Sequence, residues 1–189
     1  MAEASEKVRN GVDTEQLFGT LDAIKQTPDL GKFQWRASNK WIDGAHNRST
    51  VSGFYGAQVE DTSREEPFVI DAGEPPILIG TNTGPNPAEI VLSGLAACLT
   101  TTLVYVAAAR GVKLTEVEST VEGDMDVQGA LGLDDDYRNG FENIRVSFSV
   151  KGDAPDEKLQ ELIEQTQRRS AMFDAISNGV PVAVDLTTG

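Results

Sequence analysis

The sequence predicts an α+β domain, and two observations support this. Helical and strand-like hydrophobic patterns follow one another in the order helix, strands, long helix, strands, helix, strand, with no internal repeat. The chain has 189 residues, of which 39% are apolar, and this is long enough to bury one well-packed core. We therefore expect one globular domain, with or without an N-terminal appendage.

The charge and the cysteine content of the chain limit the classes of function that it can have. The net charge of −14 repels phosphate backbones and anionic lipid headgroups, so we expect neither a nucleic acid nor a membrane partner. The single cysteine, Cys98, cannot close an internal disulfide, and the N-terminal residues carry charges where a signal peptide has an apolar stretch. These features predict a cytoplasmic protein. With one Cys and one His, His46, a transition-metal site is not expected, nor is any other cofactor.

The first third of the chain predicts a helix, then strands, then a loop. Residues 13–26 place apolar side chains on one helical face after Asp13, which suits the N-cap position. Residues 33–59 are rich in aromatic and β-branched types around an Asp-Gly turn signal, which predicts a β-hairpin or meander. Residues 71–85 are crowded with Gly, Pro and Asn, which predicts a loop.

A long helix is predicted next. Asn86 suits the N-cap, Pro87 the first helical position, and Glu89 stands three residues after the cap, where its carboxylate can reach back to the Asn86 amide. The helix should run to Arg110 and end at Gly111.

The remaining chain predicts two strands, a second amphipathic helix and a closing strand. Alternating patterns cover residues 114–127 and 144–150, and helical spacing covers residues 155–169. A short helical turn around Phe173 and a last strand over residues 180–184 complete the expected elements.

Residues 90–109 form a run of twenty uncharged positions that contains Cys98, and three interpretations compete. The length meets the criterion for a membrane span, but the many small and hydroxyl-bearing residues favour a core helix that neighbours approach closely on every side. Cys98 is then either an inert core thiol or a reactive one. A reactive thiolate needs a cation from elsewhere in the fold, and Arg36, Arg48 and His46 are the candidates.

The stretch GPNPAEIVLSGLAACL, together with GVKL, ENIRVSFSV, GDAP and VPVAV further along, resembles the OsmC/Ohr family of osmotically inducible and organic hydroperoxide resistance proteins. The resemblance covers roughly residues 33–184. It implies an OsmC-like domain over residues 33–189 that follows an N-terminal helical extension over residues 1–32. It further implies antiparallel sheets wrapped around a long buried central helix, in an intertwined homodimer with active sites at the subunit interface.

The resemblance also implies a chemistry. In the peroxidase members, which act in the oxidative stress response, the helix cysteine attacks an organic hydroperoxide and a second cysteine resolves the sulfenic acid. Cys98 matches the first cysteine, but the second position reads Ser170-Ala171-Met172. A sulfenic acid at Cys98 would therefore need an external dithiol.

The same family implies an arginine that holds the thiolate and a glutamate that anchors this arginine. Arg36 or Arg48, and Glu89, are the candidates, so the catalytic set is Cys98, Glu89, Arg48 and Arg36. Glu89 stands one place later than the glutamate of the hydroperoxide-resistance subgroup, and a capping role is as compatible with its position.

Two functions follow as hypotheses. One is a one-cysteine thiol-dependent peroxidase that reduces organic hydroperoxides through Cys98, and nearby aromatic residues favour an apolar substrate. The other is a non-enzymatic OsmC-fold dimer that binds a small apolar ligand at the subunit interface.

Overall fold

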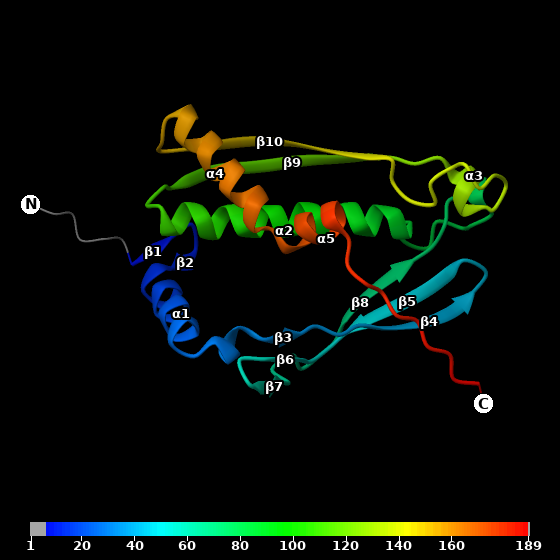
Figure 1. Cartoon of the computed structure of the whole chain (residues 1–189), viewed down its shortest axis with the longest axis horizontal. Coiled ribbons are helices and arrows are strands. Elements are labelled where there is room, and N and C mark those ends of the chain that lie inside the picture. Colours follow the sequence, from blue (N-terminus) through cyan, green and yellow to red (C-terminus); the bar gives the residue numbers. More distant parts are fainter. Residues whose placement is uncertain (1–6, 189) are drawn as a thin grey trace, which may run out of the picture. The chain divides into compact units, whose positions relative to one another are not determined.

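The computed structural model describes residues 7–188 and divides the chain into two compact units. Unit 1 joins the N-terminal residues up to Val12 with everything from Leu92 onward, and unit 2 spans Asp13–Val91. The long helix α2, Pro87–Ala109, begins in unit 2 and runs on through unit 1 (Figure 1). The helices and antiparallel sheets of the two units confirm the predicted α+β class.

Unit 2 begins with helix α1, Thr14–Gln26, as the sequence predicts. Its N-cap is Asp13, whose side chain accepts a hydrogen bond from the amide of Gln16 at 3.0 Å. The helix ends at Gln26, because Pro28 disfavours a helical conformation at Thr27, and the short 3₁₀ helix η1, Pro28–Gly31, follows.

Two antiparallel sheets form the rest of unit 2. One has the order β3-β6-β7 and the other β4-β5-β8. Their bounds are β3 Phe33–Gln34, β4 Ser38–Asp43, β5 His46–Val51, β6 Phe54–Gly56, β7 Val59–Asp61 and β8 Phe68–Ala72. The predicted hairpin is β4–β5, and Gly44 supplies the left-handed backbone (φ 53°) of its turn. Strand β8 was not predicted, since its pattern is too short to stand out.

The predicted loop before α2 is compact. It contains the 3₁₀ helix η2, Pro76–Leu78, and its chain passes very close to itself. A Cβ at Gly84 would lie 2.0 Å from the carbonyl oxygen of Asp71, and one at Gly80 would lie 1.8 Å from that of Glu74. Only glycine fits at these two positions, which explains the composition of the loop.

Unit 1 is a long hairpin with helices packed on one side. Strand β9, Leu114–Asp124, pairs with β10, Asn143–Gly152, and Val121 lies opposite Val146. Short α3, Val127–Ala130, lies in the connection, and α4, Asp156–Arg169, and α5, Ala171–Asn178, follow β10. These elements match the predicted strands and helices to within a few residues.

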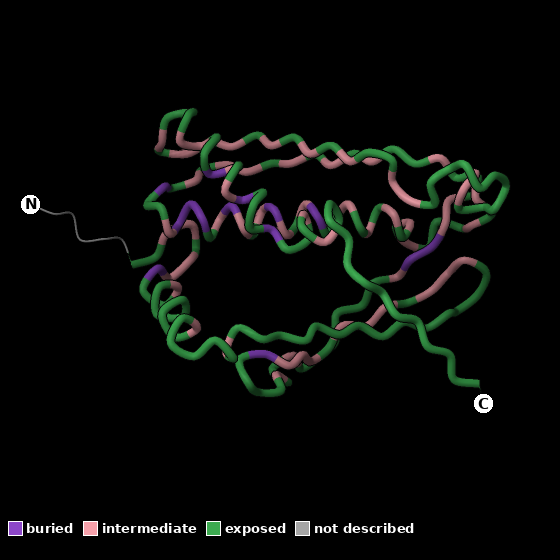
Figure 2. Tube along the Cα trace, viewed as in Figure 1, coloured by how far each residue is buried: buried purple, intermediate pink, exposed green. Residues whose placement is uncertain are grey.

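The core of unit 1 lies where α2, α4 and the hairpin meet (Figure 2). Leu103 is fully buried at 0% exposure and belongs to a cluster that also contains Val106, Ala107, Val112 and Leu162. Phe148 and Val150 of β10 pack against this cluster from the sheet side. Alternation along β10 brings its apolar side chains to this face, because successive side chains of a strand point to opposite sides.

Only one face of helix α2 is buried within the single chain, and this face carries Leu95, Leu99, Leu103 and Val106. The prediction of burial on every side therefore holds for one face only, and Tyr105, for example, is 49% exposed. Within the described residues, α2 is also the one helix that is long and apolar enough to cross a membrane, with a hydropathy of 2.0 and 28% of its most apolar stretch buried. Core helices of soluble proteins meet the same criterion.

An N-terminal hairpin, which the sequence did not predict, closes the end of α2. Its strands are β1, Val8–Arg9, and β2, Val12–Asp13. The Asn10 side chain donates to the carbonyl of Val112 and accepts from the amide of Leu114, both at 2.9 Å. Asn10 thus satisfies backbone groups that would otherwise lack partners just after the helix. Residues 1–6 of the predicted extension lie outside the described residues.

The predicted last strand over residues 180–184 is wrong. The structure has no strand there, and the alternating valines are exposed, up to 91% at Val184. A strand needs a neighbour for its backbone N–H and C=O groups, and periodicity alone does not supply one.

Candidate active site around Cys98

Cys98 lies midway along α2, and its sulfur receives hydrogen bonds from the start of α5 and from α2 itself. The Ser170 hydroxyl donates to Sγ at 3.2 Å, and Ser170 is only 2% exposed. The backbone amides of Ala171 and Met172, and the hydroxyl of Thr102, also hydrogen-bond to this sulfur. Thr102 reaches it because residues four apart lie on the same helical face.

Helix α5 contributes most of these donors, because Ser170 is its N-cap. Ala171 and Met172 are its first two residues, and amides at these positions have no partner within their own helix. The helix dipole adds partial positive charge at the same end, which favours an anion there. The dipole of α2 has no such effect on Cys98, because that residue lies several turns from the α2 N-terminus.

These contacts change the pKa of the Cys98 thiol. Burial by itself raises the pKa of Cys98, but the hydrogen bonds from Ser170, from the Met172 and Ala171 amides and from Thr102 outweigh it and lower the pKa below that of an ordinary cysteine. The environment therefore makes the thiolate, which is the nucleophilic form, easier to form than in an ordinary cysteine. The lowered pKa is the feature that the reactive interpretation of Cys98 requires, and the reactivity of the thiol stays a prediction.

A first prediction concerns the pH dependence of alkylation. Because the pKa of Cys98 is lowered, the alkylation rate of the native protein should reach half its maximum at a lower pH than that of a free cysteine measured under the same conditions. In Ser170→Ala the thiolate loses one donor, so the midpoint should move to higher pH. Iodoacetamide kinetics followed by intact mass across the pH range measure both values.

Ser177→Ala is the matched control, since Ser177 is an exposed residue of the same helix. Its alkylation midpoint should equal that of the unmodified protein. Equal midpoints for Ser170→Ala and Ser177→Ala would contradict a role for the Ser170 hydroxyl in holding the thiolate.

The predicted arginines belong to unit 2, and each has an acidic partner there. Arg36 Nη2 donates to Glu60 Oε1 at 2.7 Å. Arg48 binds Asp71 through two bonds, Nε to Oδ1 at 2.9 Å and Nη2 to Oδ2 at 3.2 Å. His46 lies 2.7 Å from the same carboxylate, and these contacts, that of Arg48 first, lower the pKa of Asp71. Arg48 and His46 therefore form one cluster with Asp71. Arg36 is not part of this cluster, because its partner is Glu60.

Glu89 has the capping role that its position suggests. Its Oε2 accepts the Asn86 amide at 2.8 Å, and Asn86 Oδ1 in turn accepts the Ala88 amide at 2.7 Å. The Asn86 side chain also donates to Glu74. This is a reciprocal cap at the start of α2. The catalytic roles of Glu89, Arg36 and Arg48 stay predictions.

Sequence reasoning treated Ser170 as a lost cysteine and did not identify it as a donor to Cys98. The spacing of Cys98 and Thr102 was the one local signal for a donor, whereas Ser170 and the α5 amides lie some seventy residues away in the chain. Between residues 7 and 188, no group of three or more His, Cys, Asp or Glu side chains is arranged to hold a metal ion.

The fold and the site together define a class: an α+β protein in which a long central helix presents one thiol to the N-terminus of a shorter helix. Residues 80–185, just over half of the chain, match the family model described as OsmC-like protein. The chain belongs to this family.

Solved structures agree on the fold. An OsmC-like protein from Mycoplasma pneumoniae aligns with a TM-score of 0.57 and 17% identity, over 76% of this chain and 87% of that one. An organic hydroperoxide resistance protein OsmC from Legionella pneumophila aligns with a TM-score of 0.54 and 17% identity, over 78% of this chain and 93% of that one. An organic hydroperoxide resistance protein from Elizabethkingia anophelis, with thiocyanate bound, aligns with a TM-score of 0.53 and 18% identity, over 76% of this chain and 89% of that one. No curated protein matches the sequence significantly.

Proposed function

We propose that this protein is a one-cysteine thiol-dependent peroxidase that reduces organic hydroperoxides through Cys98 and is restored by an external dithiol. The observation that carries this proposal is the set of hydrogen bonds from Ser170, Thr102 and the first amides of α5, which stabilises a thiolate. A coarser redox role is supported by membership of the OsmC-like family and by the fold shared with hydroperoxide resistance proteins.

The chemistry balances with one hydroperoxide and one dithiol. The Cys98 thiolate attacks the terminal oxygen, the O–O bond breaks, and the leaving alkoxide takes a proton to become the alcohol, which leaves Cys98 as a sulfenic acid. One thiol of the dithiol then displaces water to form a mixed disulfide. The second thiol releases Cys98, so the dithiol ends as a disulfide. Ser170 carries no sulfur and cannot take the resolving role.

The proposal extends to assembly and location. A cytoplasmic homodimer would cover the exposed side of α2, where Val91 and Tyr105 lie open in the single chain. The family resemblance supports such a dimer. In it, Arg48 or Arg36 would face the thiolate and Glu89 would orient the arginine. Both arginines already have carboxylate partners, so the one that acts must exchange or share its partner in the dimer.

Intact-mass analysis after one equivalent of cumene hydroperoxide tests the proposal directly. Within seconds to minutes Cys98 should gain one oxygen and be captured by dimedone, a sulfenic-acid trap, and Cys98→Ser should gain neither. Cumyl alcohol should form in the first step, one equivalent per sulfenic acid, and addition of dithiothreitol in place of dimedone should restore the original mass of the protein.

An unmodified Cys98 under these conditions would refute the peroxidase proposal. The remaining hypothesis would then be the non-enzymatic dimer that binds a small apolar ligand at the subunit interface. The missing second cysteine is the observation that favours this alternative. Trapping at Cys98 without turnover by any dithiol would limit the chemistry to the first half of the cycle.

A further inference from the structure

The loop before α2 presents two isoleucines to solvent. Ile77 is 87% exposed and Ile79 is 96% exposed, and they lie on either side of Leu78 at the end of the 3₁₀ helix η2. Residues 75–83 carry no charge. A single exposed apolar side chain is ordinary on a protein surface, but two of them on one uncharged loop form an apolar patch that is suited to contact with another surface.

Ile79 is also held in a strained backbone conformation. Its φ of 65° and ψ of 22° lie in the left-handed region, where the Cβ of a β-branched residue is crowded by the backbone. The amide of Ile79 donates to the carbonyl of Pro76 at 3.0 Å, and the amide of Gly80 donates to that of Pro75 at 3.1 Å, so the loop fixes this conformation. Glycine would adopt it without strain. Because such strain is concentrated at functional positions, it indicates a role for Ile79 beyond the fold of the single chain.

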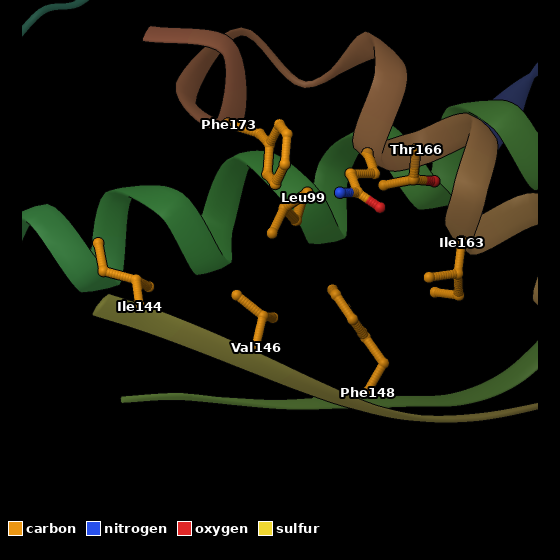
Figure 3. A pocket seen from close by; sticks show the side chains of 8 residues that line it. Leu99, Ile144, Val146, Phe148, Ile163, Thr166 and Phe173 are labelled. Carbon is orange, nitrogen blue, oxygen red and sulfur yellow. The ribbon is translucent and has the colours of Figure 1, made fainter. Parts of the chain in front are cut away.

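Unit 1 contains an apolar pocket that suits such a side chain (Figure 3). The pocket has a volume of about 240 Å³ and lies between α2, β10, α4 and α5. Val146 and Phe148 point toward the helices from β10, and Leu99 and Phe173 form the opposite wall. None of the described side chains that line it carries a charge. Benzene occupies an apolar cavity of roughly 150 Å³, so the smaller side chain of an isoleucine fits here.

We propose that, in a homodimer, Ile79 of each chain inserts into this pocket of the other chain. Ile79 is almost fully exposed, so its own chain does not supply the pocket. The net charge of −14 makes two copies repel each other, which favours contact between uncharged surfaces, and both the loop and the pocket are uncharged. Burial of the isoleucine would offset its strain. In a twofold dimer the contact occurs twice, because each copy carries one loop and one pocket.

The contact would bring a side chain of the second copy beside the Cys98 site. Leu99 follows Cys98 on α2, and the amide of Phe173 donates to the Ser170 hydroxyl at 3.3 Å, so two walls of the pocket adjoin the site. The inference rests on the homodimer of the proposed function, but on no step of the peroxidase chemistry. A failure of hydroperoxide chemistry at Cys98 would therefore leave the contact untouched.

Cross-linking tests whether the loop and the pocket of different chains meet. In a Cys98→Ser background, Ile79→Cys is combined with Gln167→Cys, since Gln167 is the exposed member of the pocket lining. A short bismaleimide should join the two introduced thiols between chains, and denaturing electrophoresis should show a covalent dimer. Ile79→Cys combined with Ser147→Cys is the matched control, because Ser147 is exposed on the outward face of β10. This pair, and each introduced cysteine alone, should give no covalent dimer.

Ile79→Gly separates the contact from the strain. Glycine relieves the left-handed backbone, so the fold should not suffer, but the inserted side chain is lost and the dissociation constant of the dimer should rise at least about tenfold. Asn82→Gly is the control, because Asn82 is exposed in the same loop and also has a left-handed backbone (φ 53°). It should leave the dissociation constant unchanged. Sedimentation equilibrium over a dilution series measures both constants.

A change on the pocket side completes the test. Val146→Phe should fill the pocket from β10 and raise the dissociation constant to a similar degree. The double variant with Ile79→Gly should lie within about twofold of the weaker single variant, because both changes remove the same contact. Far-UV circular dichroism on each variant verifies that the fold is intact.

Three results would overturn the proposal. The first is a protein that stays monomeric at every concentration, which would also remove the homodimer from the proposed function. The second is a dimer in which Ile79→Cys and Gln167→Cys give no covalent dimer, or only a link within one chain. The third is an equal effect of Ile79→Gly and Asn82→Gly on the dissociation constant, which would mean that the Ile79 side chain contributes no contact.

Discussion

Ser170→Cys should convert the protein into a two-cysteine protein. The Ser170 oxygen lies 3.2 Å from the Cys98 sulfur, so a sulfur in its place needs only a small side-chain adjustment to reach the S–S bond length of about 2.05 Å. After one equivalent of cumene hydroperoxide, the variant should lose two hydrogens in mass and form a disulfide between Cys98 and the introduced thiol. Capture of the sulfenic acid by dimedone should fall more than about 100-fold, because intramolecular resolution has a very large effective molarity.

Ser177→Cys is the control for Ser170→Cys, since it adds a thiol to the exposed part of the same helix. Dimedone should capture Cys98 in this variant as it does in the unmodified protein. The oxidant diamide, which needs no peroxidase step, separates geometry from chemistry. A disulfide with diamide but not with hydroperoxide would contradict the peroxidase proposal, whereas no disulfide with either would contradict the position of Ser170.

Leu103→Ala should be the most destabilising single substitution in the core of unit 1. Leu103 is fully buried among residues of α2, α4 and the hairpin, so truncation removes apolar contacts and leaves a cavity. We expect a loss of about 3–5 kcal/mol in the free energy of unfolding. That is a large part of the roughly 5–15 kcal/mol that holds a typical domain together. Urea unfolding followed by circular dichroism measures it, at fixed protein concentration because an oligomer would add its own dependence.

Leu131→Ala provides the comparison for Leu103→Ala, because Leu131 follows α3 and is exposed. Its effect should stay within about 0.5 kcal/mol, as for most surface substitutions. A similar, small loss for both variants would mean that the cluster around Leu103 is not the stabilising core of the unit.

Helix boundaries were predicted well wherever the signal is local. The start of α1 follows from Asp13 and that of α2 from Asn86 and Pro87, since each cap acts on amides within three residues. The end of α2 follows from Gly111, whose left-handed backbone (φ 78°) suits the residue after a helix. The alternating pattern of β10 likewise predicted which of its faces is buried.

Predictions that needed a distant partner were less successful. The valines of residues 180–184 alternate as a strand does, but the described chain offers no neighbour to pair with them. The short strands at the N-terminus depend on Asn10, which bonds to backbone groups about a hundred residues away. Neither relation leaves a periodic signal, because the partners are brought together only by folding.

Cys98 illustrates which properties the sequence predicts and which ones depend on the tertiary structure. The sequence by itself determined the fold class, the long uncharged helix, the position of its one thiol and the loss of a second cysteine at Ser170. Only the tertiary structure decided that Ser170 and the first amides of α5 surround the sulfur and lower its pKa. The physical reason is that thiol acidity depends on donors within a few ångströms in space, and spacing along the chain does not encode which distant donors will arrive there.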